Sequence, residues 1–271
     1  AEAPRLTISV TRLEQLSPTL LELGCPARVY IPLEEVSRLE SLPGEGPEWC
    51  AVLPRVWRDR DEPALRTLLE RARALGFTGV LIGNLGHLPL VRGLNFHLYG
   101  DYGLNVFNSR SLAYLKDKEL ESACVSFELR FAQIRDLKKV LRAEAIVYGR
   151  LPLMITENCL VQNETGCRLN RQGPCVPEDG PCRCGQPNVL VDRTGAAFPL
   201  LPAYGHRTEI QNSKSLYLAD RPEHRRLGLA YARLRFTTET AEECVSVVQN
   251  YLDAAPAAGD FTRGLYERGV E

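Results

Sequence analysis

Five of the nine cysteines in this 271-residue sequence lie in one short polar stretch. They are Cys159, Cys167, Cys175, Cys182 and Cys184, and the residues between them are rich in Gly, Pro, Asn and Arg. Such a composition buries little apolar surface, so clustered thiols are the groups that could order the segment, through a metal or through disulfides.

The spacing of these cysteines leaves three interpretations open: an iron–sulfur cluster, a structural zinc site, and disulfides or free thiols. The sulfurs of Cys182 and Cys184 are close enough in sequence to reach one metal, but the gaps fit neither a zinc ribbon nor a bacterial ferredoxin pattern. His206 lies downstream in a loop-like segment and is either a further ligand or a solvated residue. The remaining cysteines border apolar runs and are expected to be small buried hydrophobes; they are Cys25, Cys50, Cys124 and Cys244.

A second group of polar residues follows the predicted strands. Each could simply cap a helix or bond a loop, but together they form a mixed-charge rim that could hold a small anionic or polyhydroxylated ligand. The substrate-binding candidates are Arg55, Asn84, Asp101, Asn105, Asn108, Glu128, Tyr148 and Arg150.

The elements that position these groups alternate regularly over the first 150 residues. Short β-branched or apolar runs precede helical patterns, as where residues 49–56 precede a helix over residues 63–75 with an apolar stripe and Gly76 at its end. Strands that alternate with helices pair in parallel through right-handed crossovers. The number of units predicts an α/β fold, a TIM-barrel-like (β/α)8 barrel, whose functional groups lie at the carboxyl ends of the strands.

The cysteine-rich segment interrupts this alternation before the last βα unit. We expect β/α units over residues 1–150, an insert over 151–220 with a β-hairpin at Asp192–Leu201, and a final βα unit with a tail over 221–271, all in one structural domain. Nine strands are predicted where a barrel needs eight, and residues 104–107 form the weakest of them.

Composition argues against several classes of protein. The net charge of −1 provides no global attraction to nucleic acid or anionic lipid, although a local patch would suffice. No apolar run approaches the roughly 20 residues of a membrane span. No export signal is recognisable and the cysteine count is odd, so a reducing cytoplasm is expected. The chain starts almost inside a strand, which suggests further domains of a longer parent chain. No GxSxG, HExxH or glycine-rich phosphate loop is present.

An ordered series of motifs resembles one family over nearly the whole chain. The series is LPRVWRD, GNLG, GDYGLNVFNS, SFEL, YGRLPLM, ENC, LVDRTGAAFPL and HRTEIQNSKSLYLAD. It is similar to the collagenase-like, unclassified (U-type) peptidase family 32, and in particular to the C-terminal barrel region of longer bacterial members.

This resemblance implies two activities. One is proteolysis, including collagen degradation, without agreed catalytic residues. The other is oxygen-independent hydroxylation by members that carry a four-cysteine [4Fe–4S] cluster and modify RNA or a quinone precursor, with prephenate as an oxygen donor for some. The second activity, on RNA, is our leading expectation. A protease is the alternative, and a zinc-stapled, non-catalytic binding domain is a third.

The resemblance also implies a set of metal ligands. Cys159 and Cys167 match the first two cysteines of the family, and Cys184 is the choice for the third, with Cys182 or Cys175 as substitutes. The fourth usually belongs to a Cys-Arg pair, where this chain has His206-Arg207. His206 is therefore expected to be a ligand, unless an extra cysteine replaces it or zinc replaces the cluster. Arg55 and Arg150 are expected to hold a prephenate-like, carboxylate-bearing donor.

Overall fold

The computed structural model describes residues 3–165 and 186–269. The chain divides into two compact units. The first comprises Ala1–Gly149 with Leu216–Glu271, and the second comprises Arg150–Ser215.

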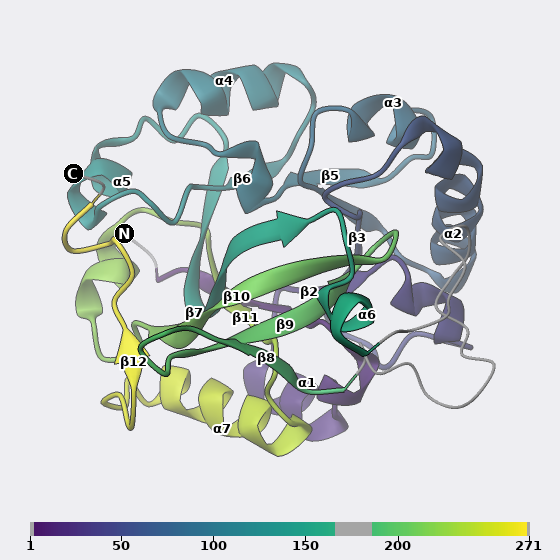
Figure 1. The fold of residues 1–271 in the computed structure, drawn as a ribbon. Coiled ribbons are helices and arrows are strands. Elements are labelled where there is room, and N and C mark those ends of the chain that lie inside the picture. Colours follow the sequence, from purple (N-terminus) through teal and green to yellow (C-terminus); the bar gives the residue numbers. More distant parts are fainter. Residues whose placement is uncertain (1–2, 166–185, 270–271) are drawn as a thin grey trace. The chain divides into compact units, whose positions relative to one another are not determined.

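A closed barrel of eight parallel strands forms the first unit (Figure 1). In sheet order the barrel runs β11-β1-β2-β3-β4-β5-β6-β7, and β11 pairs with β7 to close it. The strands are β1 (Arg5–Ser9), β2 (Arg28–Pro32), β3 (Glu48–Val52), β4 (Gly79–Ile82), β5 (His97–Gly100), β6 (Ser122–Cys124), β7 (Arg142–Thr156) and β11 (Tyr231–Arg235). The predicted (β/α)8 class is confirmed.

Helices connect the strands and lie along the outside of the barrel (Figure 1). In this unit they are α1 (Pro18–Gly24), α2 (Glu62–Leu75), α3 (His87–Val91), α4 (Ser109–Asp117), α5 (Phe131–Asp136) and α7 (Ala241–Leu252). The predicted stripe of α2 is buried at Leu65, Leu69 and Ala72. Gly76 ends this helix with φ = 100°, a conformation that L side chains rarely adopt.

Residues 104–107 do not form the ninth strand. A 3₁₀ turn covers Tyr102–Leu104, and Val106 makes only an isolated bridge to Val125. The apolar alternation of this stretch packs a loop against the barrel, so the predicted strand is wrong and eight strands remain.

The C-terminal tail is fastened to the barrel after the short strand β12 (Phe261–Thr262). The ring of Tyr266 is buried and stacks on Phe131 with 5.3 Å between ring centroids. The Tyr266 hydroxyl donates to the carbonyl oxygen of Ile146 in β7 at 2.6 Å. The tail therefore contributes to the core of this unit.

The second unit contains a sheet with the order β7-β10-β9-β8. Its further elements are α6 (Leu160–Thr165), β8 (Asn188–Val191), β9 (Ala197–Ala203) and β10 (Arg207–Tyr217). β8 and β9 form an antiparallel hairpin around the expected turn, where Asp192 Oδ1 accepts the N–H groups of Thr194 and Ala196. Among the described residues, no helix combines the length and the apolar character needed to cross a membrane.

Candidate functional site

The interior of the barrel is unusually polar. At its amino-terminal end Arg28 forms an ion pair with Glu48 at 3.0 Å and donates to the hydroxyls of Ser122 and Tyr231. The Arg28 guanidinium also lies 3.6 Å from the centroid of the Tyr99 ring. These partners lie on four strands, and with β2 itself five strands are linked through one arginine.

A second arginine, Arg233 of β11, lies nearer the carboxyl ends of the strands and is 1% exposed. Its guanidinium bonds Glu144 of β7 through two nitrogens and reaches Asp101 Oδ1 at 2.5 Å. The other Glu144 oxygen accepts the hydroxyls of Thr7 and Tyr30. Burial alone would lower the pKa of Arg233, but the two carboxylates outweigh it and raise that pKa well above its usual value.

Asp101 lies where this buried network meets the mouth of the barrel, directly after β5. Its Oδ1 also accepts the N–H of Tyr102 at 2.8 Å. Within the described part of the chain, Oδ2 makes no hydrogen bond, so one oxygen of a rigidly held carboxylate remains available to a ligand. Arg233 therefore positions Asp101.

Two further arginines flank the ring of Tyr102. The guanidinium carbons of Arg55 and Arg235 lie 5.5 Å and 5.9 Å from its centroid, and Arg55 Nη1 lies 3.3 Å from the Tyr102 hydroxyl. Gly103 allows this packing, because a β-carbon there would stand 2.6 Å from the carbonyl oxygen of Gly83 and 3.3 Å from Arg55 Cδ. Arg55, Arg235 and Asp101 therefore form a mouth suited to a ligand that carries a carboxylate or phosphate next to a hydrogen-bond donor. The arginines would bind the anion, and Asp101 would accept the hydrogen bond.

Three of the predicted rim residues have roles in local structure. Asn108 caps α4, because its Oδ1 accepts the N–H groups of Arg110 and Ser111. Asn105 adopts φ = 47° and ends the 3₁₀ turn. Tyr148 is buried and donates its hydroxyl to Glu239 at 3.1 Å.

The other predicted residues are spread over both units. Glu128 is partly exposed after β6. Arg150 belongs to the second unit, where its Nη1 donates to the carbonyl oxygens of Asn212 and Ser213. Asn84 follows β4 and lines a cavity beside α4. Only Arg55 and Asp101 of the eight predicted residues are therefore drawn together around Tyr102.

Sequence reasoning missed Arg233, Glu144 and Arg235. The sequence contains a pattern that could have identified them, because these charges lie in strands whose neighbouring residues are apolar. In a barrel, alternate residues of each strand point inward, so a charge on that register is buried. Burial raises the pKa of the Glu34 carboxyl, which follows β2, to about 7.

The described thiols of the first unit do not form a nucleophilic centre. Cys50, Cys124 and Cys244 are buried as expected, and burial raises the pKa of each thiol. Cys25 is exposed, contrary to the expectation that it is buried, because it occupies the left-handed position that ends α1. A protonated, enclosed thiol is a poor nucleophile.

The side chains of three histidines contact backbone carbonyls or carboxylates. His87 Nε2 donates to the carbonyl oxygen of Pro54 at 3.1 Å, and His224 Nδ1 bonds that of Arg221. His97 faces the carboxylates of Glu48 and Glu121. Among the described residues, none of these three is paired with a hydroxyl or thiol nucleophile.

The described metal-ligand candidates lie in the second unit on two adjoining segments. Arg207 forms a bidentate ion pair with Glu157 at 3.0 and 3.2 Å. The N–H of Leu160 donates to the hydroxyl of Thr208 at 3.0 Å. On one segment Glu157 and Leu160 lie on either side of Cys159. On the other, their partners Arg207 and Thr208 directly follow His206. Cys167, Cys175, Cys182 and Cys184 lie outside the described residues, and no group of three metal-binding side chains occurs within them.

Comparison with known proteins gives one family. The family model described as Peptidase family U32 matches residues 42–191, more than half of the chain. No curated protein sequence matches.

Several solved structures resemble the chain at low sequence identity. The U32 peptidase Mk0906 is 7% identical with a TM-score of 0.48, over 89% of this chain and 96% of that one. Thiamine phosphate pyrophosphorylase from Pyrococcus furiosus is 8% identical with a TM-score of 0.43, over 92% and 95%. The spore cortex-lytic enzyme SleL of Bacillus megaterium is 9% identical with a TM-score of 0.41, over 94% and 74%.

Proposed function

The chain belongs to peptidase family U32, and from that premise we propose that it is an iron–sulfur-dependent enzyme that hydroxylates RNA without molecular oxygen. The observation that carries the proposal is the placement of Cys159 and His206 on adjoining segments of the second unit. Both side chains are of types that bind iron–sulfur clusters and zinc.

The surroundings of Cys159 fit a metal ligand. The residue is 8% exposed, and its sulfur accepts the N–H of Gln162 at 3.4 Å. Hydrogen bonds to sulfur and exclusion of water are means by which proteins tune iron–sulfur clusters. Cys159, Cys167, Cys184 and His206 would hold the cluster, with Cys175 or Cys182 as substitutes. When bound, a [4Fe–4S] cluster supplies one-electron transfer, and a zinc ion at the same residues would supply only a structural staple.

The mouth of the barrel would bind the oxygen donor in the first unit. Arg55 and Arg235 can each form bidentate bonds to a carboxylate, which suits a prephenate-like donor. Arg235 joins Arg55 in this proposal because their guanidinium carbons lie 5.9 Å and 5.5 Å from the centroid of the same Tyr102 ring, whereas Arg150 belongs to the second unit. Asp101, fixed by Arg233, can accept a proton through its second oxygen.

Nucleoside analysis tests this function. RNA from a strain that lacks the gene should lose one nucleoside that carries an added oxygen atom. The parent gene should restore this nucleoside during growth without air, while Cys159→Ala should not and Arg55→Gln should restore only part of it. Unchanged RNA in the deletion strain would contradict the proposal.

A protease assay separates the alternative. Casein or gelatin cleavage that survives both air and removal of iron by a chelator, and that Cys159→Ala retains, would assign the older family activity instead. Our proposal predicts no such cleavage.

A further inference from the structure

A cavity lies beside α4 in the first unit, next to the loops that follow β4 and β5. Its volume is about 540 Å³, within the range of roughly 300–1,000 Å³ typical of small-ligand sites. Asn84, Leu85, Gly103, Leu104, Arg110, Ser111, Tyr114 and Leu115 line it. The two loops meet closely at its base, because a β-carbon on Gly103 would lie 2.6 Å from the carbonyl oxygen of Gly83.

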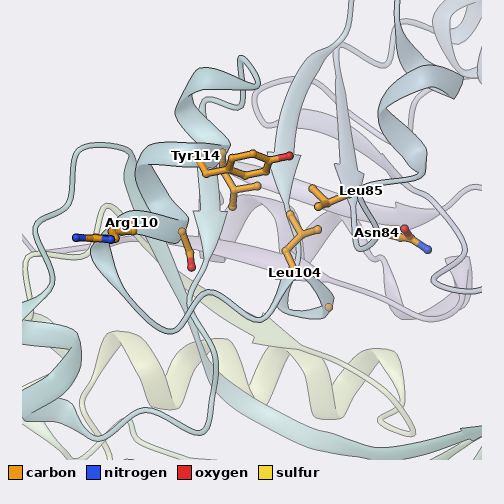
Figure 2. Close-up of a pocket in the computed structure, with 8 residues that line it drawn as sticks. Asn84, Leu85, Leu104, Arg110 and Tyr114 are labelled. Carbon is orange, nitrogen blue, oxygen red and sulfur yellow. The ribbon is translucent and has the colours of Figure 1, made fainter.

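The middle of this cavity is apolar and aromatic. Figure 2 shows Tyr114, Leu104 and Leu85 grouped between Arg110 on one side and Asn84 on the other. Tyr114 is 48% exposed and Leu85 is 44% exposed, although both lie in a cavity rather than on a convex surface. Large side chains left open in this way offer a flat ligand a surface on which to stack.

The polar groups at the edges are available for a ligand. Asn84 Oδ1 accepts the N–H of Gly86 at 2.8 Å, which leaves its amide N–H groups as donors. Within the described residues, the Arg110 guanidinium and the Tyr114 hydroxyl have no hydrogen-bond partner.

The charge of the cavity is positive. Arg110 is the one charged residue in its lining, and Lys118 Nζ lies 5.2 Å from the centroid of the Tyr114 ring. The cavity therefore combines an aromatic face, a hydrogen-bond donor and one cation, and a second cation lies beside its aromatic ring.

We propose that this cavity binds one unstacked nucleotide of a single-stranded RNA. Its base would stack on Tyr114 against Leu85 and Leu104, with an acceptor on the base edge facing the Asn84 amide. Phosphates would contact Arg110 and Lys118. Single strands are favoured because the faces of paired bases are covered by their neighbours, whereas proteins that bind unpaired bases stack them on aromatic rings. The inference rests on the proposed function for its choice of RNA, and it adds where the substrate strand is gripped.

Fluorescence anisotropy with a dye-labelled, single-stranded RNA oligonucleotide tests the site on the full chain. Tyr114→Ala should weaken binding by about 5- to 150-fold, the range found when one stacking residue is removed. Tyr114→Trp should keep the affinity, because an aromatic face is retained. Arg110→Gln should weaken binding and make the slope of log affinity against log salt shallower by roughly 0.7, as the loss of one phosphate contact requires.

Two matched controls lie outside the cavity. Arg135→Gln removes an exposed arginine of α5 that pairs with Asp136, and Leu252→Ala removes an exposed apolar side chain of α7. Both should bind the oligonucleotide as the parent does. Parent-like affinity and salt slope in both Tyr114→Ala and Arg110→Gln would overturn the inference, and so would equal binding of duplex RNA.

A small aromatic acid could bind the cavity through the same contacts as a nucleotide. Phenylpyruvate, which is such an acid, tests this alternative. If it displaces the oligonucleotide from the parent at concentrations below those at which RNA binds, the cavity is a small-molecule site and the inference fails. Failure of the proposed function looks different: RNA would remain unmodified while its binding still depended on Tyr114. A modifying enzyme whose Tyr114→Ala variant binds and modifies RNA normally would contradict the inference alone.

Discussion

Burial determines the protonation state of His87, the first residue of α3. Its side chain is fully enclosed, and its Nε2–H donates to Pro54, whereas Nδ1 has no partner in the described structure. Burial lowers the pKa of this imidazole from 6.5 to about 4. The fold therefore holds a neutral histidine that the unfolded chain would protonate below pH 6.5.

This shift predicts an acid sensitivity. Between pH 6.5 and pH 4 the unfolded state binds more protons at His87, so the free energy of unfolding should fall as the pH is lowered, by up to about 3 kcal/mol. His87→Gln can keep the bond to Pro54 but does not titrate. Urea unfolding across this pH range should show a shallower slope in the variant, and an unchanged slope would contradict the assignment.

For single side chains, the sequence predicts position in the fold better than it predicts function. Asp101 and Arg55 were identified because they follow strands, and both lie at the mouth. Asn108 was identified by the same criterion, but its side chain caps α4. An asparagine side chain can bond either the N–H groups of a helix N-terminus or a ligand, and the sequence alone does not distinguish the two roles. Arg233 and Glu144 were missed because their strands, β11 and β7, are far apart in sequence and become neighbours only when the barrel closes.

Gly149 shows how one element is fitted to its neighbour. It lies in β7 with φ = 118°, beside an irregularity in the pairing of β7 with β11 between Arg233 and Leu234. A β-carbon on Gly149 would lie 2.0 Å from the carbonyl oxygen of Arg235. Only glycine allows the two strands to approach this closely.

Gly149→Ala is therefore expected to lower the free energy of unfolding by about 3 kcal/mol or more, from backbone strain and displacement of β11. Gly93→Ala is the matched control in the same unit, since Gly93 has φ = 81° with no atom within 4 Å of the added carbon. It should cost only about 1 kcal/mol. Urea titrations compare the two, and equal losses would show that contact with Arg235 is unimportant.

Helices and strands can be predicted where the spacing of apolar residues follows one simple pattern. The strands of a parallel barrel are buried on both faces and appear as apolar runs, and the stripe of α2 was recognised from its spacing. Residues 104–107 were misassigned because a loop packed on the barrel has the same composition as a strand. The buried ring of Tyr266 was not predicted, because its partners Phe131 and Ile146 are more than a hundred residues away in sequence.

The whole barrel is held together by buried charge as well as by apolar packing. Arg233→Met should destabilise the chain by about 3–5 kcal/mol, because Glu144 and Asp101 would remain buried without a compensating cation. Adding Glu144→Gln should recover part of this loss, since the double variant buries less unpaired charge. Thermal or urea unfolding of the single and double variants measures the coupling, and strictly additive losses would contradict it.

Across the whole molecule, we expect the cysteine-rich unit to bind an iron–sulfur cluster. Iron and acid-labile sulfide content, with a visible absorption spectrum, should be measured on protein purified without oxygen. We predict about four irons and four sulfides per chain, as a [4Fe–4S] cluster requires, retained in Cys25→Ala, whose cysteine is exposed and lies in the first unit, and lost in Cys159→Ala. A colourless protein that takes up no iron after anaerobic reconstitution, or a Cys159→Ala variant with the parent's iron content, would contradict the account.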